Sequence, residues 1–100
     1  MMKSTIVEDI ASREINKYRE LSFGELEKWV ISQDVVTNTV TYDGQEYQLE
    51  ADARWDDAVR KHIRVTVFVT PSRPKHWWQH FFSKASAGFI KDSQGNFIGE

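Results

Sequence analysis

The amino-acid sequence predicts an α+β fold, with two N-terminal helices packed on one face of a four- to five-stranded antiparallel β-meander. Apolar residues first recur every three to four positions, which is the spacing of amphipathic helices. From about residue 35 onwards, apolar and polar residues alternate, as they do in strands with one buried face. The dipeptide Asp43-Gly44, which is favoured in two-residue hairpin turns, separates the first two alternating runs.

The two predicted helices cover about residues 5–20 and 23–31. Each begins at an S/T-x-x-E motif, at Thr5–Glu8 and at Ser22–Glu25. This spacing is typical of a capping box, in which two side chains satisfy free backbone N–H groups at a helix start. The apolar face of the first helix consists of Ile6, Val7, Ile10, Ala11, Ile15 and Tyr18.

The first two strands have a predicted register. A two-residue loop at Asp43-Gly44 would set Val40 opposite Tyr47 and Val36 opposite Ala51. The apolar faces of both strands then coincide, as a stable register requires. The opposite face of the first three strands carries mainly Thr, Gln, Glu, Asp and Arg, so we expect it to meet water or a partner.

The remaining sheet is predicted from two more apolar segments and a final hairpin. The run at 62–70 alternates strictly, and the aromatic run at 76–82 is expected to form a fourth strand. A four-residue loop around Asp92–Gly95 would set Phe89 opposite Ile98 and Ile90 opposite Phe97. Both faces of this hairpin would then be apolar, and one would need a cover from a helix or a second subunit. The sheet spans about residues 35–99 of a single domain, 1–100.

Composition narrows the function classes. The chain has 100 residues, no cysteine and 28% charged residues, which is typical of one soluble domain in a reducing compartment. Without an apolar run of roughly 20 residues we expect no membrane segment, and we expect a cytoplasmic protein. The first half carries five Lys/Arg against ten Asp/Glu, and the second half eight against five. Such asymmetry is typical either of a charged binding face or of acidic helices beside a basic sheet.

The residues give little support for catalysis, a metal or a cofactor, and we expect none of the three. His76 and His80 on one strand would lie about 13 Å apart, too far for one metal ion. Asp56-Asp57 is a carboxylate pair, but its position favours a turn over acid–base work. No nucleophile elbow or phosphate-binding glycine loop is present in the sequence.

A basic aromatic region at 64–84 is the candidate contact surface. Protein–protein contact is the leading interpretation, either as a homodimer or as an antidote-like (immunity) protein that covers a toxin's site. Single-stranded nucleic-acid binding is the alternative, because aromatic rings stack on bases while cations follow phosphates. Trp77 and Trp78 could equally be core residues. The candidate residues are Arg64, Phe68, Arg73, Lys75, His76, Trp77, Trp78 and His80.

Three stretches together resemble a family of small bacterial domains of unknown function. They are YRELSFGEL (18–26), YQLEADARWDD (47–57) and GFIKDSQGNFIGE (88–100). The resemblance covers about residues 18–100 and implies the same order of parts and a bacterial origin, but no activity. The chain departs from the family at AVRKHIRV, at PSRPKHWW and in its last turn, DSQG.

Overall fold

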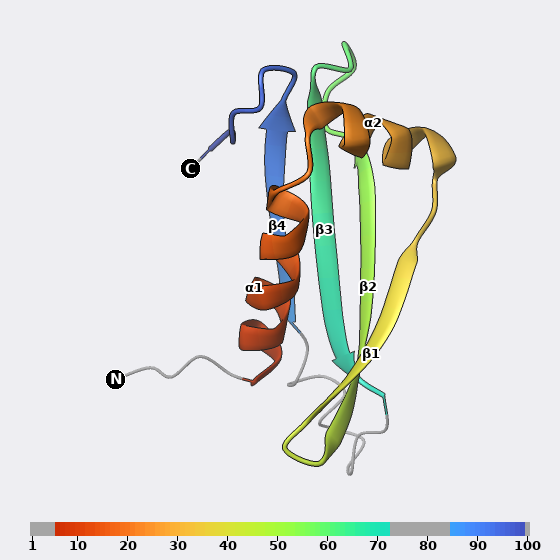
Figure 1. Ribbon diagram of the computed structural model, residues 1–100, viewed down its shortest axis with the longest axis vertical. Helices are drawn as coiled ribbons and strands as arrows, with labels where there is room; N and C mark the ends of the chain where they lie inside the picture. Colours follow the sequence, from red (N-terminus) through yellow and green to blue (C-terminus); the bar gives the residue numbers. More distant parts are fainter. Residues whose placement is uncertain (1–5, 73–84, 100) are drawn as a thin grey trace.

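The computed structural model describes residues 6–72 and 85–99 and confirms the α+β class (Figure 1). The strands form one antiparallel sheet in the order β1-β2-β3-β4, so β1 and β4 are its edges. No described helix is long and apolar enough to cross a membrane. The elements, in chain order, are α1 (Ile6–Arg19), α2 (Phe23–Ser32), β1 (Val36–Tyr42), β2 (Gln45–Trp55), β3 (His62–Pro71) and β4 (Ala85–Asp92).

The β1–β2 hairpin has the predicted register. Val40 pairs with Tyr47, and Val36 pairs with Ala51. Asp43 has φ 54° and Gly44 has φ 79°, the left-handed backbone that a type I′ turn needs at both central positions. The turn chemistry and the alternating pattern therefore select the same pairing.

One of the two inner strands is β3, whose alternate side chains are completely buried. The strand that pairs with it on the far side is β4, and Val65 faces Phe89 there. The predicted strand at 76–82 falls within 73–84, outside the described residues. The fully buried side chains of β3 are Ile63, Val65, Val67 and Val69.

The predicted register of the last hairpin is wrong by one residue. Lys91 pairs with Phe97, and the Ile90 carbonyl accepts a 2.9 Å hydrogen bond from the Ile98 N–H. The loop has three residues and not four, because the Asp92 carboxylate accepts the backbone N–H groups of Gln94 and Asn96 at 2.9 and 2.8 Å. Gly95, with φ 86°, supplies the left-handed residue that ends such a loop.

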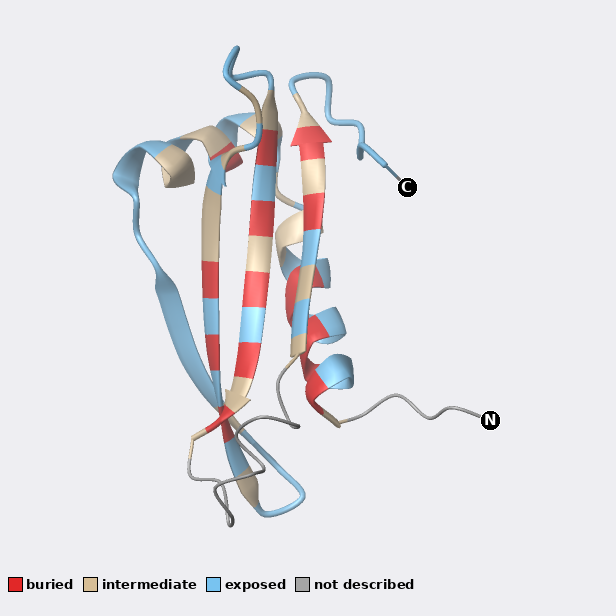
Figure 2. Ribbon diagram, turned by 180° about the vertical axis from the view of Figure 1, so that it is seen from behind, coloured by how far each residue is buried: buried red, intermediate tan, exposed pale blue. Residues whose placement is uncertain are grey.

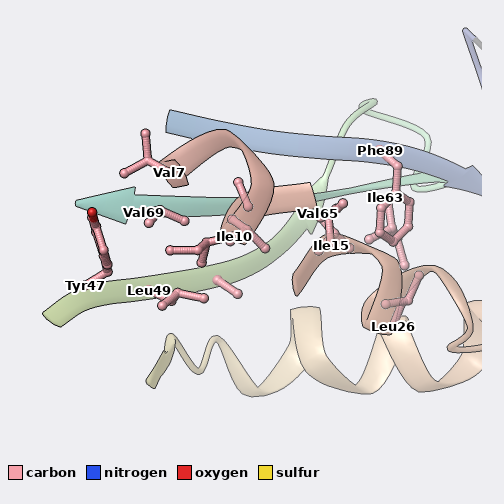
Figure 3. Packing of buried hydrophobic residues seen from close by; sticks show 13 residues of the cluster. Val7, Ile10, Ile15, Leu26, Tyr47, Leu49, Ile63, Val65, Val69 and Phe89 are labelled. Atoms are coloured by element: carbon pink, nitrogen blue, oxygen red, sulfur yellow. The ribbon is translucent and has the colours of Figure 1, made fainter. Parts of the chain in front are cut away.

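Both helices cover the same face of the sheet, as predicted. α1 packs on β3 and β4, whereas α2 packs mainly on β2 (Figure 1). Figure 3 shows side chains of α1, such as Ile10 and Ile15, pointing toward those of the strands. The predicted capping box starts α2, since Ser22 Oγ accepts the Glu25 N–H at 3.1 Å and Glu25 accepts the Ser22 N–H in return. Thr5 lies outside the described residues.

A buried lysine fixes the corner between the helices. Lys91 of β4 is 7% exposed, and its ammonium donates to the carbonyls of Arg19 and Leu21 at 3.0 and 2.7 Å. These carbonyls lie at the end of α1, where helical partners run out. The ammonium also lies 5.0 Å from the centre of the Phe97 ring. The corner is therefore tied to β4, and α2 starts directly after it.

We expect Lys91→Met to lower the free energy of unfolding by about 1.5–3 kcal/mol, because it removes a charged donor from two half-buried carbonyls while keeping the apolar stem. Chemical denaturation measures the loss. Lys28→Met, at an exposed position of α2, is the matched control and should change stability by less than about 0.5 kcal/mol. Equal stabilities of the two variants would contradict this role for Lys91.

Candidate functional site

The structure describes two of the eight predicted contact residues. Arg64 and Phe68 lie on β3, on the sheet face that the helices leave open. They are four residues apart, which separates them by about 13 Å along the strand. The other six lie outside the described residues: Arg73, Lys75, His76, Trp77, Trp78 and His80.

The open face carries charges of both signs, and its arginines are engaged. Arg64 Nε donates to Asp56 Oδ1 at 2.8 Å, and an Arg54 nitrogen donates to Asp52 Oδ2 at 2.8 Å. Phe68 is 49% exposed, and its cross-strand partner is Glu50. This part of the face therefore combines two ion pairs with the exposed ring of Phe68.

The Asp56-Asp57 pair closes the β2–β3 turn, in agreement with its interpretation from the sequence. Asp57 Oδ1 accepts the backbone N–H groups of Lys61 and His62 at 2.9 and 3.0 Å. Burial acts to raise the pKa of Asp57, but these hydrogen bonds and the nearby His62 outweigh it and lower the pKa below 3.8. No cluster of three or more metal-ligating side chains occurs within 6–72 and 85–99.

The strongest candidate site in the described structure is the edge strand β1. It reads VTNTVTY, without a charge or a proline, and six of its seven residues are exposed (Figure 2). Edge strands in stable monomers are usually blunted by lysines, prolines, bulges or a covering segment. The opposite edge has two of these devices, because Lys91 points inward and the segment after Asp92 bonds back to β4 at Ile90.

The backbone groups of three threonines point away from the sheet at this edge. Tyr42 closes a two-residue hairpin with Gln45, and such closing pairs exchange both hydrogen bonds. Hydrogen-bonded pairs alternate with non-hydrogen-bonded pairs along a hairpin, so the backbone groups of the even-numbered residues of β1 bond to β2. The Glu46 carbonyl fits this alternation, since it accepts the Ser72 N–H on the far side at 3.0 Å. The outward donors and acceptors therefore belong to Thr37, Thr39 and Thr41.

Exposed apolar side chains lie around this edge. Ile31, in the last turn of α2, and Val35, just before β1, are 72% and 57% exposed. Val36 and Tyr42, at the two ends of β1, are 37% and 39% exposed. Between the helices and β1 lie two hollows, of about 420 Å³ beside Val36 and about 220 Å³ beside Tyr42. Neither helix makes its main contacts with β1, which explains this exposure.

The α1 wall of the smaller hollow contains a buried carboxylate. Glu14 is 7% exposed and accepts hydrogen bonds from Lys17 Nζ at 2.9 Å and from the Tyr18 hydroxyl at 3.3 Å. Burial, the Glu14 charge and this hydrogen bond raise the pKa of Tyr18 to about 12. Tyr18 therefore keeps its proton at neutral pH, and the Glu14 charge has two donors.

The β1 edge was not selected from the sequence, although a signal for it exists. In a meander the first strand is an edge, and VTNTVTY lacks every residue that usually protects an edge strand.

Searches of protein-family models, curated proteins and solved structures find no match to the chain. The resemblance to small bacterial domains stays a prediction.

We expect Asp57→Asn to flatten the acid dependence of stability. The native pKa is below the unfolded value, so the charged carboxylate stabilises the fold above about pH 4, and this contribution disappears as pH falls through the native pKa. Asparagine keeps an acceptor oxygen but not the charge. The variant should melt at a lower temperature than the parent at about pH 7, and this gap should be smaller at about pH 3. An unchanged gap at both pH values would contradict the assignment.

Proposed function

We propose that the chain acts without catalysis, by protein–protein contact through strand addition at β1. One observation carries this proposal: β1 is an exposed, uncharged edge strand with outward backbone donors and acceptors. Strand addition uses such main-chain groups for affinity and alternate side chains for specificity. A homodimeric module and an antidote-like cover for another protein are both forms of this contact.

The energetics favour an extended protein segment as the ligand. Each backbone hydrogen bond to Thr37, Thr39 or Thr41 replaces one to water and contributes about 0.5–1.5 kcal/mol. Burial of the exposed parts of Val36 and Tyr42 adds about 25 cal/mol for each Å² removed from water. Because β1 carries no charge, an incoming strand meets no repulsion from it.

Phe68 favours a second candidate function, which is single-stranded nucleic-acid binding through the region 64–84. Its ring is 49% exposed on the open face, where a base could stack on it. Glu50 and Asp52 lie on the same face, however, and would repel phosphates. Arg64 and Arg54 already bond to carboxylates. Protein contact is therefore the better-supported proposal.

If the second candidate holds, fluorescence anisotropy of labelled single-stranded oligonucleotides should rise with protein and fall steeply with salt, as phosphate-driven binding does. Phe68→Ala should weaken binding by about 1–3 kcal/mol, because a stacking surface is lost. Val59→Ala, at another exposed apolar position, is the control and should not weaken it. An oligonucleotide affinity that changes neither with salt concentration nor with Phe68→Ala would exclude this candidate.

The protein-contact proposal is tested by a photo-crosslinking residue introduced at position 39, on the outward edge. In host cells it should crosslink to a protein, and adding Thr37→Pro should abolish the product, because proline removes an outward N–H while the bonds to β2 remain. The same photo-crosslinker at Ser12, exposed on α1, is the control and should give no such product. If no protein crosslinks from position 39, or if the proline variant crosslinks equally well, strand addition at β1 does not occur.

A further inference from the structure

The β1 strand is complementary to itself when two copies run antiparallel about a two-fold axis at Thr39. We infer that a second copy of this chain occupies the β1 edge in this register. The inference rests on the proposed function, because it names the partner of the same edge. A two-fold interface requires one surface that matches itself, so β1 must be complementary to its own reverse.

The outward backbone groups match in this register. Thr39 faces Thr39 of the second copy, and Thr37 faces Thr41. These are the residues whose N–H and C=O groups point away from β2, so every facing pair can exchange both of its hydrogen bonds. All 7 residues of β1 are used. A one-residue slip would oppose outward groups to inward ones, and a two-residue slip would leave one end of the strand unpaired.

The side chains match on the open face and at the two ends of the helix side, whereas between those ends Asn38 faces Val40 of the second copy. Thr–Thr pairs form on the open face, where cross-strand hydroxyl contacts are favourable. On the helix side Val36 meets Tyr42 of the second copy, which is a favourable pair of a β-branched and an aromatic residue. These two side chains are the 37% and 39% exposed ends of β1, so pairing covers apolar surface that the single chain leaves open.

The absence of charge within β1 favours pairing with a second copy, whereas charges just beyond the two ends of the strand oppose it. No charged residue lies within β1, so no like charges face each other across the axis. At the ends, the register brings the exposed Asp34 of one copy near Asp43 of the second. Salt screens such exposed repulsion. The dimer should therefore tighten as salt increases, whereas phosphate-driven nucleic-acid binding weakens.

The size of the contact sets the expected affinity. A seven-residue strand spans about 23 Å, and an interface formed mainly by one strand pair belongs to the class below about 1,200 Å². Interfaces of that size are weak or transient. We therefore expect a reversible dimer that dissociates in roughly the micromolar range.

A charge exchange at Thr39 tests the register. Thr39→Lys and Thr39→Glu should each raise the dissociation constant about fivefold or more, because each places like charges opposite one another. An equimolar mixture of the two should form a heterodimer at least as tight as the parent dimer. Sedimentation velocity measures the single variants, and native mass spectrometry identifies the mixed species. A mixture no tighter than the single variants would overturn the Thr39-centred register.

The opposite edge supplies the matched control. Ser86 is exposed on the open face of β4, so Ser86→Lys should leave the parent dimer unchanged. The chain has no cysteine, so a mild thiol oxidant added to the purified protein should link Thr39→Cys into a disulfide-bonded dimer but should not link Ser86→Cys. A bonded antiparallel pair has Cα atoms about 5.5 Å apart, which a disulfide can span. A dimer broken by Ser86→Lys, or linked through Ser86→Cys, would overturn the β1 assignment.

The outcomes separate this inference from the proposed function. A parent chain that stays monomeric at millimolar concentration, together with a crosslink from position 39 to a different protein, overturns the second copy and keeps strand addition. The absence of both a dimer and a crosslink from position 39 would overturn the inferred second copy and the proposed strand addition. A crosslink from position 39 to another copy of the chain, with heterodimer rescue, supports both.

Discussion

The position of the helix corner over β4 is the constraint on which the rest of the structure depends. Lys91 holds it there, because its buried ammonium bonds to the carbonyls of Arg19 and Leu21 at the end of α1. A buried ammonium needs hydrogen-bond acceptors, and carbonyls at a helix end without intrahelical partners need donors, so each group satisfies the other. The capping box at Ser22 then starts α2 directly beyond the corner. Together these contacts place α1 over β3 and β4 and turn α2 toward β2.

This placement divides the sheet unequally. Two short helices cannot cover four strands, and their main contacts leave out β1. The inner strand β3 is completely buried along one face from Ile63 to Val69, whereas β1 is exposed along most of its length. A single interaction at β4 therefore has a consequence at the opposite edge, because α1 stays over β3 and β4 and α2 reaches mainly β2. The exposed edge is a product of the packing and not of a loose strand.

The fold was predictable from the sequence where short-range chemistry and periodicity agree. Asp43-Gly44 and the alternation around it gave the β1–β2 register, and the capping motif at Ser22 gave the start of α2. The last hairpin was misplaced by one residue, because the Asp92 carboxylate tightens the turn through side-chain bonds that periodicity does not record. The β1 edge was missed for a different reason. Its threonines look like an ordinary strand until the coverage of the helices is known, and that depends on Lys91, a charged residue that propensity would place in water.

The asymmetry between the two edges also determines what kind of assembly strand addition can give. A sheet with two open edges can pair head to tail without limit, which leads to fibres. Here the end of β4 is blocked over Ile90–Asp92 by the chain's own C-terminal segment, and β4 carries the inward-pointing Lys91. Only β1 then combines a full-length strand with an uncharged sequence and outward backbone groups among the described elements. Pairing of β1 with itself uses up the open edge of both copies, so addition stops at two. The same packing that exposes β1 thus favours a closed contact over continued growth.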